Sequence, residues 1–452
     1  MISRDVGATK PRPANPARGE LLQVLGVTFG IAVALGAMIG VGILRAPSLI
    51  ARDVPGVSLI LALWLIALLH AVLEANVIAE LGTAMPKAGG PYIYVHRAFG
   101  DIGGLVVGWT IWMQRVASTA ALSIAFAEFA SQLWPVLAGM TPAIAVVVQL
   151  ALFGLNIVGV REGRTIQEVT SFLKAIALLG FCAAVYLIAS PHALVKSHPA
   201  AVPGWIAIIA AYQLIVGAYS GWYEPAFFSE ETPNAARNLP RAMMIGLLLT
   251  ACLYLGINAA LLHALSPSDL ARYPLPFAAA LAGNGKFVAA SVTIFAMVSA
   301  ASCANAGIMS APRVLLALSR DSLLPAFFRN VNAGGSPAWA TIFTAAAAIL
   351  MALSGSFTLA FGLIATLQSA SFILVISALF VLRRREPGLV RPFRAIAYPW
   401  APLLVLLIDF ALFALFLNAN WMGGLYAGIM WMLAIPFAMI ARRSRRTGNA
   451  DV

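Results

Sequence analysis

The chain is a succession of long apolar stretches, most of them near or above twenty residues, separated by short polar segments. An α-helix needs about 20 apolar residues to cross a bilayer. Because lipid offers the backbone no hydrogen-bond partners, stretches of this length cross only as helices, whereas barrel strands are roughly ten residues long and alternate. We therefore predict an all-α integral membrane protein. Twelve membrane-spanning stretches are predicted, at 24–49, 57–82, 103–133, 142–160, 166–189, 206–229, 242–265, 287–318, 338–354, 357–382, 400–418 and 423–441.

The composition argues against several other classes of protein. Apolar residues make up 61% of the chain and charged residues 10%, whereas a soluble domain carries roughly 25% charged residues. A soluble two-domain enzyme, a disordered protein and a nucleic-acid-binding domain are therefore poor fits. Cys182, Cys252 and Cys303 lie inside apolar stretches without metal-ligand spacing, and we interpret them as core residues.

The positions of lysine and arginine predict the orientation in the membrane. Cytoplasmic loops carry an excess of these residues. With both termini inside, most of the 29 Lys and Arg residues fall in inner loops and tails, which include the predicted cytoplasmic tails 1–20 and 442–452. The net charge of +12 then reflects multi-pass topology in a plasma (inner) membrane. The lipid bilayer is the expected partner, and nucleic acid is not.

Two of the predicted spans are interrupted by glycine. The first span carries Gly36, Gly40 and Gly42, and the sixth carries Gly217 and Gly221. These two spans cross the membrane in opposite directions. A broken helix that opens each half of an inverted repeat indicates the central binding site of a transporter. The alternative is that these glycines only allow close packing between membrane helices.

A helix interrupted within the membrane leaves backbone groups without partners. The N–H groups around Gly40, Val41 and Gly42 would attract a carboxylate, and glycine lets a ligand approach the backbone closely. In the sixth span, the C=O groups of Gly217, Ala218 and Tyr219 would face an ammonium. N–H groups on one side and C=O groups on the other suit a zwitterion, and an amino acid is the obvious candidate.

Several segments resemble one family of transporters, the amino acid–polyamine–organocation (APC) permeases. The matches run in the family's order from about residue 25 to 400, and several motifs in order are more specific than any one alone. They resemble the family's broken first helix, the loop after its second helix, its sixth helix with the exit that follows, and the end of its eighth helix. The matching segments are 39–43, 79–100, 221–231 with 238–241, and 313–321 with Leu324 and Pro325.

The resemblance implies the leucine-transporter (LeuT) fold. Twelve membrane helices would form two inverted repeats of five, in which helices 1 and 6 are broken, followed by two appended helices. The first repeat would cover 21–190, the second 204–384, and the appended helices 385–441. Members of the family carry amino acids or related amines by alternating access.

The resemblance also implies a substrate site. Gly40, Val41 and Gly42 would contact the carboxylate. Two departures from the family are visible: Val41 stands where some exchangers have serine, and Gly217 stands where they have an aromatic gate. Another aromatic residue would then have to close the site, unless the substrate is bulky. The remaining predicted residues are Met38, Gly217, Ala218 and Ser220, whose backbone oxygens would bind the amine, and Trp222 or Tyr219 as the closing aromatic residue.

Ionisable residues at membrane depth are costly and are functional candidates. By resemblance to sodium-independent members of the family, the ammonium of Lys174 would replace a sodium ion. It would bond carbonyls of the first span and hydroxyls of the eighth, where Ser299 and Ser302 are the candidates. The alternative is a lysine that extends to the inner membrane surface.

We interpret five of the other ionisable residues within the predicted spans. Arg45 and Glu224 each follow a helix break, so they could pair across the site. Alternatively, Arg45 lines an outer vestibule and Glu224 carries a proton or contacts the substrate. His70 and Glu74 are one helical turn apart, which allows a proton relay or a structural hydrogen bond. We interpret Asp409 as a packing or oligomer contact.

The sequence contains no motif for direct ATP binding, zinc proteolysis or nucleophilic hydrolysis. We therefore expect a transporter without catalytic residues, metal or cofactor. The predicted function is secondary active transport of amino acids, independent of sodium, by proton symport or exchange. Its expected partners are a small amino acid or amine substrate and, for symport, protons. The alternatives are a polyamine or organic cation transporter of the same fold, a channel, or a transporter-like sensor.

Overall fold

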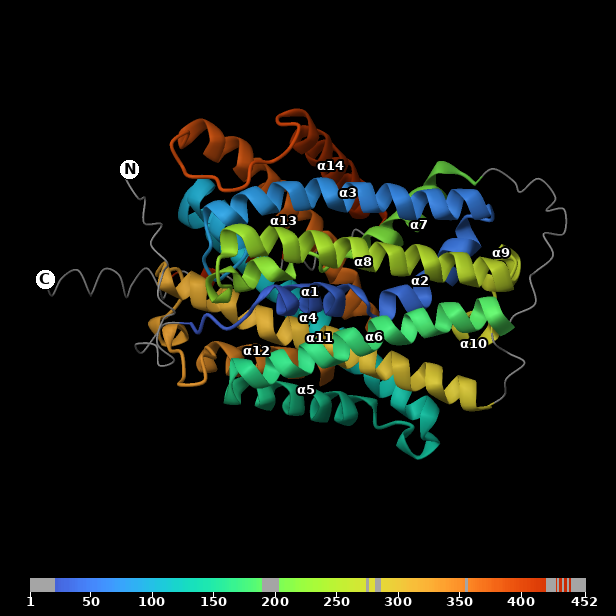
Figure 1. Cartoon of the computed structure of the whole chain (residues 1–452). Coiled ribbons are helices and arrows are strands. Elements are labelled where there is room, and N and C mark those ends of the chain that lie inside the picture. Colours follow the sequence, from blue (N-terminus) through green and yellow to red (C-terminus); the bar gives the residue numbers. More distant parts are fainter. Residues whose placement is uncertain are drawn as a thin grey trace, which may run out of the picture.

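The computed structural model describes residues 21–188, 203–273, 276–280, 286–353 and 357–419, with isolated positions between 428 and 439. Within these residues the regular structure is helical, and most helices run along the long axis of the molecule (Figure 1). The α-helices are α1 (Val27–Met38), α2 (Val41–Asp53), α3 (Val57–Ala84), α4 (Pro91–Leu133), α5 (Thr141–Val158), α6 (Val160–Ile188), α7 (Trp205–Tyr219), α8 (Ala235–Ala264), α9 (Pro267–Leu270), α10 (Pro276–Ala280), α11 (Lys286–Arg320), α12 (Ala338–Leu353), α13 (Phe357–Arg385) and α14 (Trp400–Ala419). Three 3-10 helices are η1 (Pro135–Leu137), η2 (Glu224–Glu231) and η4 (Ala326–Arg329).

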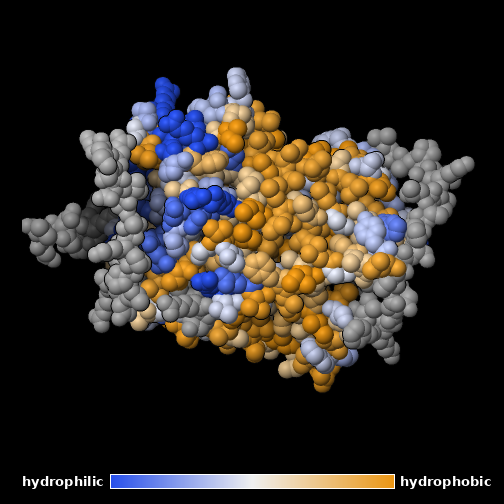
Figure 2. Space-filling model, viewed as in Figure 1, coloured by the Kyte–Doolittle hydropathy of each residue, from blue (hydrophilic) through white to orange (hydrophobic). Residues whose placement is uncertain are grey.

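Several of these helices are long and apolar enough to cross a membrane. In the described residues seven single helices meet this condition, or eight spans if α1 and α2, bent by 43°, are counted as one broken span. Hydrophobic residues cover the middle of the visible face, and hydrophilic residues gather toward one end (Figure 2). Large apolar side chains such as Leu187, 84% exposed, and Leu350, 70% exposed, point outward. A broad apolar surface of this kind belongs in lipid, so the chain is a multi-pass membrane protein.

The predicted spans from 24–49 to 400–418 fall on described helices or helix pairs, whereas 423–441 lies mostly outside the described residues. The third span differs most from its prediction. Its helix, α4, begins at Pro91 and passes through a kink at Gly100, where φ is 73°. Hydropathy detects only the apolar part of this helix, because the residues before Gly100 include several polar ones.

Small residues let α1 and α8 pack closely near the centre of the bundle. A Cβ atom on Gly30 would lie 2.6 Å from Ala242 Cβ, and one on Gly246 would lie 2.7 Å from Ala34 Cβ. Contact between small residues is how membrane helices approach one another without a hydrophobic driving force. This contact fixes α1, and with it the end of α1 at Met38, beside α8.

Ion pairs gather at the end of the molecule where α3, α11 and α13 finish, which we call the ionic end. It is defined by Arg383 with Glu80, Arg313 with Glu231, Arg320 with Glu230, and Arg97 with Glu386. These pairs connect α3 with α13, η2 with α11, and α4 with the segment after α13. Charge-assisted hydrogen bonds therefore connect the helices at this end.

Candidate functional site

The first helix break lies between α1 and α2. Met38 ends α1 and Val41 begins α2, while Gly40 has an extended backbone at φ −123° and ψ −163°. A Cβ on Gly40 would lie 2.9 Å from Cys303 Sγ, so α11 leaves little space for a side chain here. The last carbonyls of α1 and the first N–H groups of α2 have no helical partners, because every helix end leaves such groups unpaired.

The carbonyl side of this break surrounds a buried lysine. Lys174 of α6 is fully buried, and its Nζ donates to Gly36 O at 2.8 Å and to Ile39 O at 2.7 Å. Ser299 of α11 donates to the same Ile39 oxygen at 2.7 Å. Cys303 Sγ lies 3.6 Å from Lys174 Nζ and 2.7 Å from Gly36 O. An ammonium therefore occupies the position where carbonyl and hydroxyl oxygens could otherwise surround a metal cation.

This arrangement differs in detail from the sequence prediction. Ser299 shares an acceptor with Lys174, whereas Ser302 Oγ is buried and has no hydrogen-bond partner within the described part of the chain. Cys303, interpreted from the sequence as a core residue, is the third side chain at this break. A cysteine in an apolar span gives no sequence signal for such a contact, because its neighbours come from α1 and α6.

The N–H side of the first break is the start of α2. Gly40 is the N-cap residue, and no side chain caps the helix there. Gly40 N–H donates to Met38 O at 2.7 Å, so this predicted carboxylate donor is already engaged. Val41 and Gly42 supply N–H groups of the first turn, where a helix carries partial positive charge. A Cβ on Gly42 would lie 3.6 Å from Ala218 Cα, which places the start of α2 against the end of α7.

The second break lies between α7 and η2. Tyr219 ends α7, Gly221 has φ 119°, and η2 begins at Glu224. A Cβ on Gly221 would lie 2.7 Å from Ala37 Cβ and 3.0 Å from Ala37 C. Glycine is required here both for the backbone conformation and for the close approach. The two breaks predicted from the sequence are therefore in direct contact.

Tyr254 of α8 connects the two breaks. Its buried hydroxyl lies 2.6 Å from Met38 O and 3.1 Å from Ala218 O, and it donates to both carbonyls. The Tyr254 ring packs 5.3 Å from Trp64 and 5.3 Å from Tyr219. Sequence analysis missed Tyr254, although it assigned both carbonyls to amine binding. The sequence feature that could have indicated Tyr254 is a tyrosine hydroxyl inside an apolar span.

Two of the other predicted residues of the second break, Ser220 and Trp222, contact α13. Ser220 donates from Oγ to Gln368 Oε1 at 2.8 Å. Trp222 is buried and lies edge-on to Phe372, with ring centroids 6.0 Å apart. Gly217 O accepts a hydrogen bond from Ser220 N–H at 3.2 Å, and a Cβ on Gly217 would meet no atom within 4 Å.

The charges next to the breaks pair differently from one predicted alternative. Glu224 is fully buried and forms its ion pair with Arg115 of α4, whose guanidinium lies 5.1 Å from the Tyr223 ring. Arg45 pairs with Glu128 at 3.9 Å, and both side chains are more than a third exposed. The alternative of an Arg45–Glu224 pair is therefore wrong. A buried carboxylate needs a buried counter-charge, which α4 supplies, whereas Arg45 lies in a partly open region.

His70, Glu74 and Asp409 form a separate buried group. His70 Nε2 lies 3.2 Å from Asp409 Oδ1 and 4.0 Å from Glu74 Oε1. Asp409, interpreted from the sequence as a packing or oligomer contact, instead completes a three-residue cluster between α3 and α14. Sequence spacing predicted the proximity of His70 and Glu74, but it gave no sign of Asp409, which lies far away in the chain.

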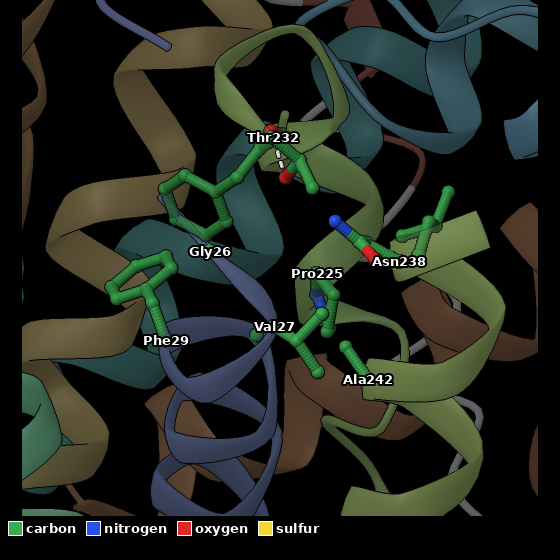
Figure 3. Close-up of a pocket in the computed structure, with 10 residues that line it drawn as sticks. Gly26, Val27, Phe29, Pro225, Thr232, Asn238 and Ala242 are labelled. Carbon is green, nitrogen blue, oxygen red and sulfur yellow. Dashed lines mark hydrogen bonds between the residues drawn. The ribbon is translucent and has the colours of Figure 1, made fainter. Parts of the chain in front are cut away.

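A small pocket lies at the other end of α1, away from the breaks (Figure 3). Its walls come from the start of α1, from η2 and from the start of α8. None of the predicted substrate-binding residues lines it. The lining residues are Gly26, Val27, Phe29, Gly30, Pro225, Phe228, Thr232, Asn238, Leu239 and Ala242.

Comparisons with known proteins identify one family and several relatives. The profile of the family described as "Amino acid permease" matches residues 25–440. The serine/threonine exchanger SteT of Bacillus subtilis is 27% identical over 392 residues, covering 85% of this chain and 89% of that protein. The branched-chain amino acid permease BcaP of the same organism is 26% identical and covers 93% of both chains. The b(0,+)-type amino acid transporter 1 of Mus musculus is 26% identical, covering 86% of this chain and 82% of that protein.

These relatives are transporters and not enzymes, and the family match extends over most of the chain. The apolar helices, the contact between two broken helices and the match over residues 25–440 all agree. The chain belongs to the amino acid permease family of the APC superfamily, and it is a multi-pass membrane transporter.

Proposed function

We propose that this protein carries amino acids across the plasma membrane by alternating access, independently of sodium. The contact between the two helix breaks supports this proposal most directly. The start of α2 meets the end of α7, with Gly42 beside Ala218. The positive end of one half-helix thus lies next to the negative end of another, which suits the carboxylate and the ammonium of one zwitterion.

The proposed substrate site follows from these backbone groups. The substrate carboxylate binds the N–H groups of Val41 and Gly42, and Gly40 keeps the approach free of side chains. The substrate ammonium faces the carbonyls of Gly217 and Ala218. Ala218 O also accepts from Tyr254, and a carbonyl oxygen has two lone pairs, so it can accept both donors.

The remaining predicted residues take supporting parts in this proposal. Met38 O, already bonded by Tyr254, lies on the amine side of the site. Ser220 connects the second break to Gln368 of α13. Trp222 supplies the aromatic surface that closes the site in place of the family's gate at Gly217.

Lys174 supports the proposal of sodium independence. Its ammonium bonds the Gly36 and Ile39 carbonyls of the first break. A cation bound there in a sodium-coupled relative would need the same oxygens. The lysine supplies this positive charge permanently, so the first break holds its shape without a bound ion.

The architecture is also proposed. Twelve membrane helices form inverted repeats over 21–190 and 204–384, with two appended helices over 385–441. Both termini are cytoplasmic, with tails 1–20 and 442–452, and the ionic end faces the cytoplasm. The excess of arginine at that end supports this orientation.

The names of the relatives support an amino acid substrate. They leave two modes of transport to distinguish, exchange of one amino acid for another and uptake without exchange. SteT is named as an exchanger and BcaP as a permease. Uptake of a labelled amino-acid panel into proteoliposomes, with and without unlabelled amino acid inside, separates these modes. Uptake that requires internal amino acid identifies an exchanger. Uptake of polyamines but of no amino acid would contradict the proposed substrate class.

Gly42→Leu tests the site itself. A leucine side chain would extend past the Cβ position, 3.6 Å from Ala218 Cα, into the carboxylate site, and we expect uptake to fall to background. Gly154→Leu is the matched control, because a Cβ on Gly154 of α5 meets no atom within 4 Å. Normal uptake by folded Gly42→Leu protein would contradict the site assignment.

A further inference from the structure

A second ionic site lies between α3 and α14, apart from the helix breaks. One ring nitrogen of His70 and one carboxylate oxygen each of Glu74 and Asp409 meet there, and these three atoms lie within 4.8 Å of one another. The side chains are only 3%, 10% and 6% exposed. Helices α3 and α14 lie side by side (Figure 1), and the three residues lie near the middle of these helices, at the depth of the hydrocarbon core.

The charges of this cluster do not balance. Neutral His70 with ionised Glu74 and Asp409 carries two negative charges, and a protonated His70 removes only one. In the part of the chain that the structure describes, no lysine or arginine forms an ion pair with either carboxylate. Because an unneutralised carboxylate is costly inside a membrane, the cluster needs one further positive charge.

Hydrogen bonding within the cluster is incomplete. His70 Nε2 is buried but has no hydrogen bond among the described residues, since Asp409 Oδ1 is close to it but off the direction of a ring N–H. Asp409 Oδ2 is likewise buried without a partner there. A proton placed on Glu74 would add a donor for which Asp409 Oδ2 is an open acceptor, while a protonated His70 is itself a donor at Nε2, so charge and hydrogen bonding are satisfied together.

The cluster also contacts α7, the helix that ends at the second break. Tyr212 of α7 stacks on His70, with ring centroids 6.3 Å apart and planes at 28°. Tyr223, which follows the break, directly precedes η2, and η2 packs against α3, the helix that carries Glu74. The Tyr223 ring also adjoins Arg115, the partner of Glu224. The titratable groups that face the cluster from neighbouring elements are therefore Tyr212 and Tyr223, one on each side of the break.

We propose that His70, Glu74 and Asp409 bind a proton that is carried with the substrate. This inference rests on the proposed transport function and makes the protein a proton symporter. The proton adds to a carboxylate from the outer solution, gives a neutral cluster with protonated His70, and leaves on the inner side. The change in charge when the cluster binds or releases this proton is transmitted to the broken sixth span through Tyr212 and Tyr223.

The test uses full-length protein in proteoliposomes and the amino acid found by panel uptake. A pH gradient with the acidic side outside, and no membrane potential, should drive accumulation of the substrate by the wild type. For one proton per substrate, the ratio of internal to external substrate should approach about tenfold per pH unit. An internal pH dye should report acidification when substrate is added outside. Wild-type protein that exchanges amino acids but ignores the gradient would overturn the proton site while leaving the transport function intact.

Variants of the cluster sharpen this test. Glu74→Gln and Asp409→Asn remove the proton-accepting groups with little change of shape. We expect both to lose gradient-driven accumulation while counterflow exchange persists at a measurable rate. Glu168→Gln is the matched control, because Glu168 pairs with Arg164 on the surface of α6, and it should accumulate substrate as the wild type does.

Three results would overturn the proposal. The first is full gradient-driven accumulation by Glu74→Gln and Asp409→Asn. The second is loss of exchange in both variants, which would make the cluster structural. The third is stoichiometric zinc in purified wild type that is lost in His70→Gln. Failure of the proposed function is distinguishable, because the wild type would then show no counterflow.

Discussion

The two helix breaks are held in different ways. At the first break, the Gly36 and Ile39 carbonyls accept hydrogen bonds from the Lys174 ammonium, with Ser299 and Cys303 beside it. At the second, Gly217 O accepts from a neighbouring backbone N–H. Hydrogen bonds from a charged donor are roughly twice as strong as neutral ones. We therefore expect the first break to be the rigid part of the proposed site, and the second to be the part that rearranges around a substrate.

Lys174→Ala should have the largest effect, because it removes the charged donor that distinguishes the two breaks. Two buried carbonyls each lose a hydrogen bond from a charged donor, worth about 1.5–3 kcal/mol, and keep only the neutral donors Ser299 and Cys303. We expect a lower unfolding temperature in detergent and uptake slowed by more than about tenfold, still without sodium dependence. Lys87→Ala, at an exposed lysine, is the control. Undiminished uptake by Lys174→Ala would show that the lysine does not support the first break.

Gly221→Ala tests whether geometry holds the second break. The left-handed backbone at φ 119° costs a side-chain-bearing residue about 1–2 kcal/mol, and the new Cβ would lie 2.7 Å from Ala37 Cβ. We expect a moderate loss of thermal stability and slower transport. Gly154→Ala, on the open face of α5, should leave both measurements close to wild type. Equal behaviour of the two variants would mean that the second break tolerates a side chain.

Tyr254→Phe acts on both breaks at once. It removes one neutral hydroxyl shared by the Met38 and Ala218 carbonyls, a loss of about 0.5–1.5 kcal/mol. We expect a small decrease in unfolding temperature and a larger change in substrate affinity, since the Ala218 carbonyl belongs to the proposed amine site. Tyr186→Phe on the exposed face of α6 is the control. Affinity that does not change would remove Tyr254 from the site.

The smallest effect is expected at the ionic end, far from either break. His96 Nδ1 lies 3.3 Å from Asp321, and His96 Nε2 lies 3.0 Å from Asp101. The hydrogen bond with Asp321 raises the pKa of His96 above its ordinary value, with Asp101 adding to the increase and partial burial opposing it. The contribution to stability is therefore complete below about pH 6.5 and is lost as the pH rises through the raised pKa.

Unfolding temperatures of wild type and His96→Gln across this pH range measure the effect. The difference between them should shrink toward alkaline pH, while uptake at a fixed pH stays similar. A difference that grows with pH would contradict the sign of this linkage.

The positions of both breaks were predictable from the sequence, because glycine interrupts an otherwise continuous apolar span at Gly40 and Gly221. Hydropathy also located the helices. The count of twelve spans stays a prediction, because 423–441 lies mostly outside the described residues. The repeat structure also stays a prediction.

The partners at the site were harder to predict. Tyr254 and Cys303 look like ordinary core residues, and only the fold brings them to carbonyls of α1. The Arg45–Glu224 alternative was wrong because proximity to a break along the chain does not determine which way a side chain points. The contact of Asp409 with His70 could not be predicted, because only the fold shows that α14 lies beside α3.

The close packing of α1 and α8 has a mechanical consequence. The two helices are in close contact where Gly30 meets Ala242 and where Gly246 meets Ala34. A side-chain rotation alone therefore cannot separate them. Force applied to one helix is therefore delivered to the other. Because α8 also carries Tyr254, movement of α8 would act directly on the Met38 and Ala218 carbonyls at the two breaks.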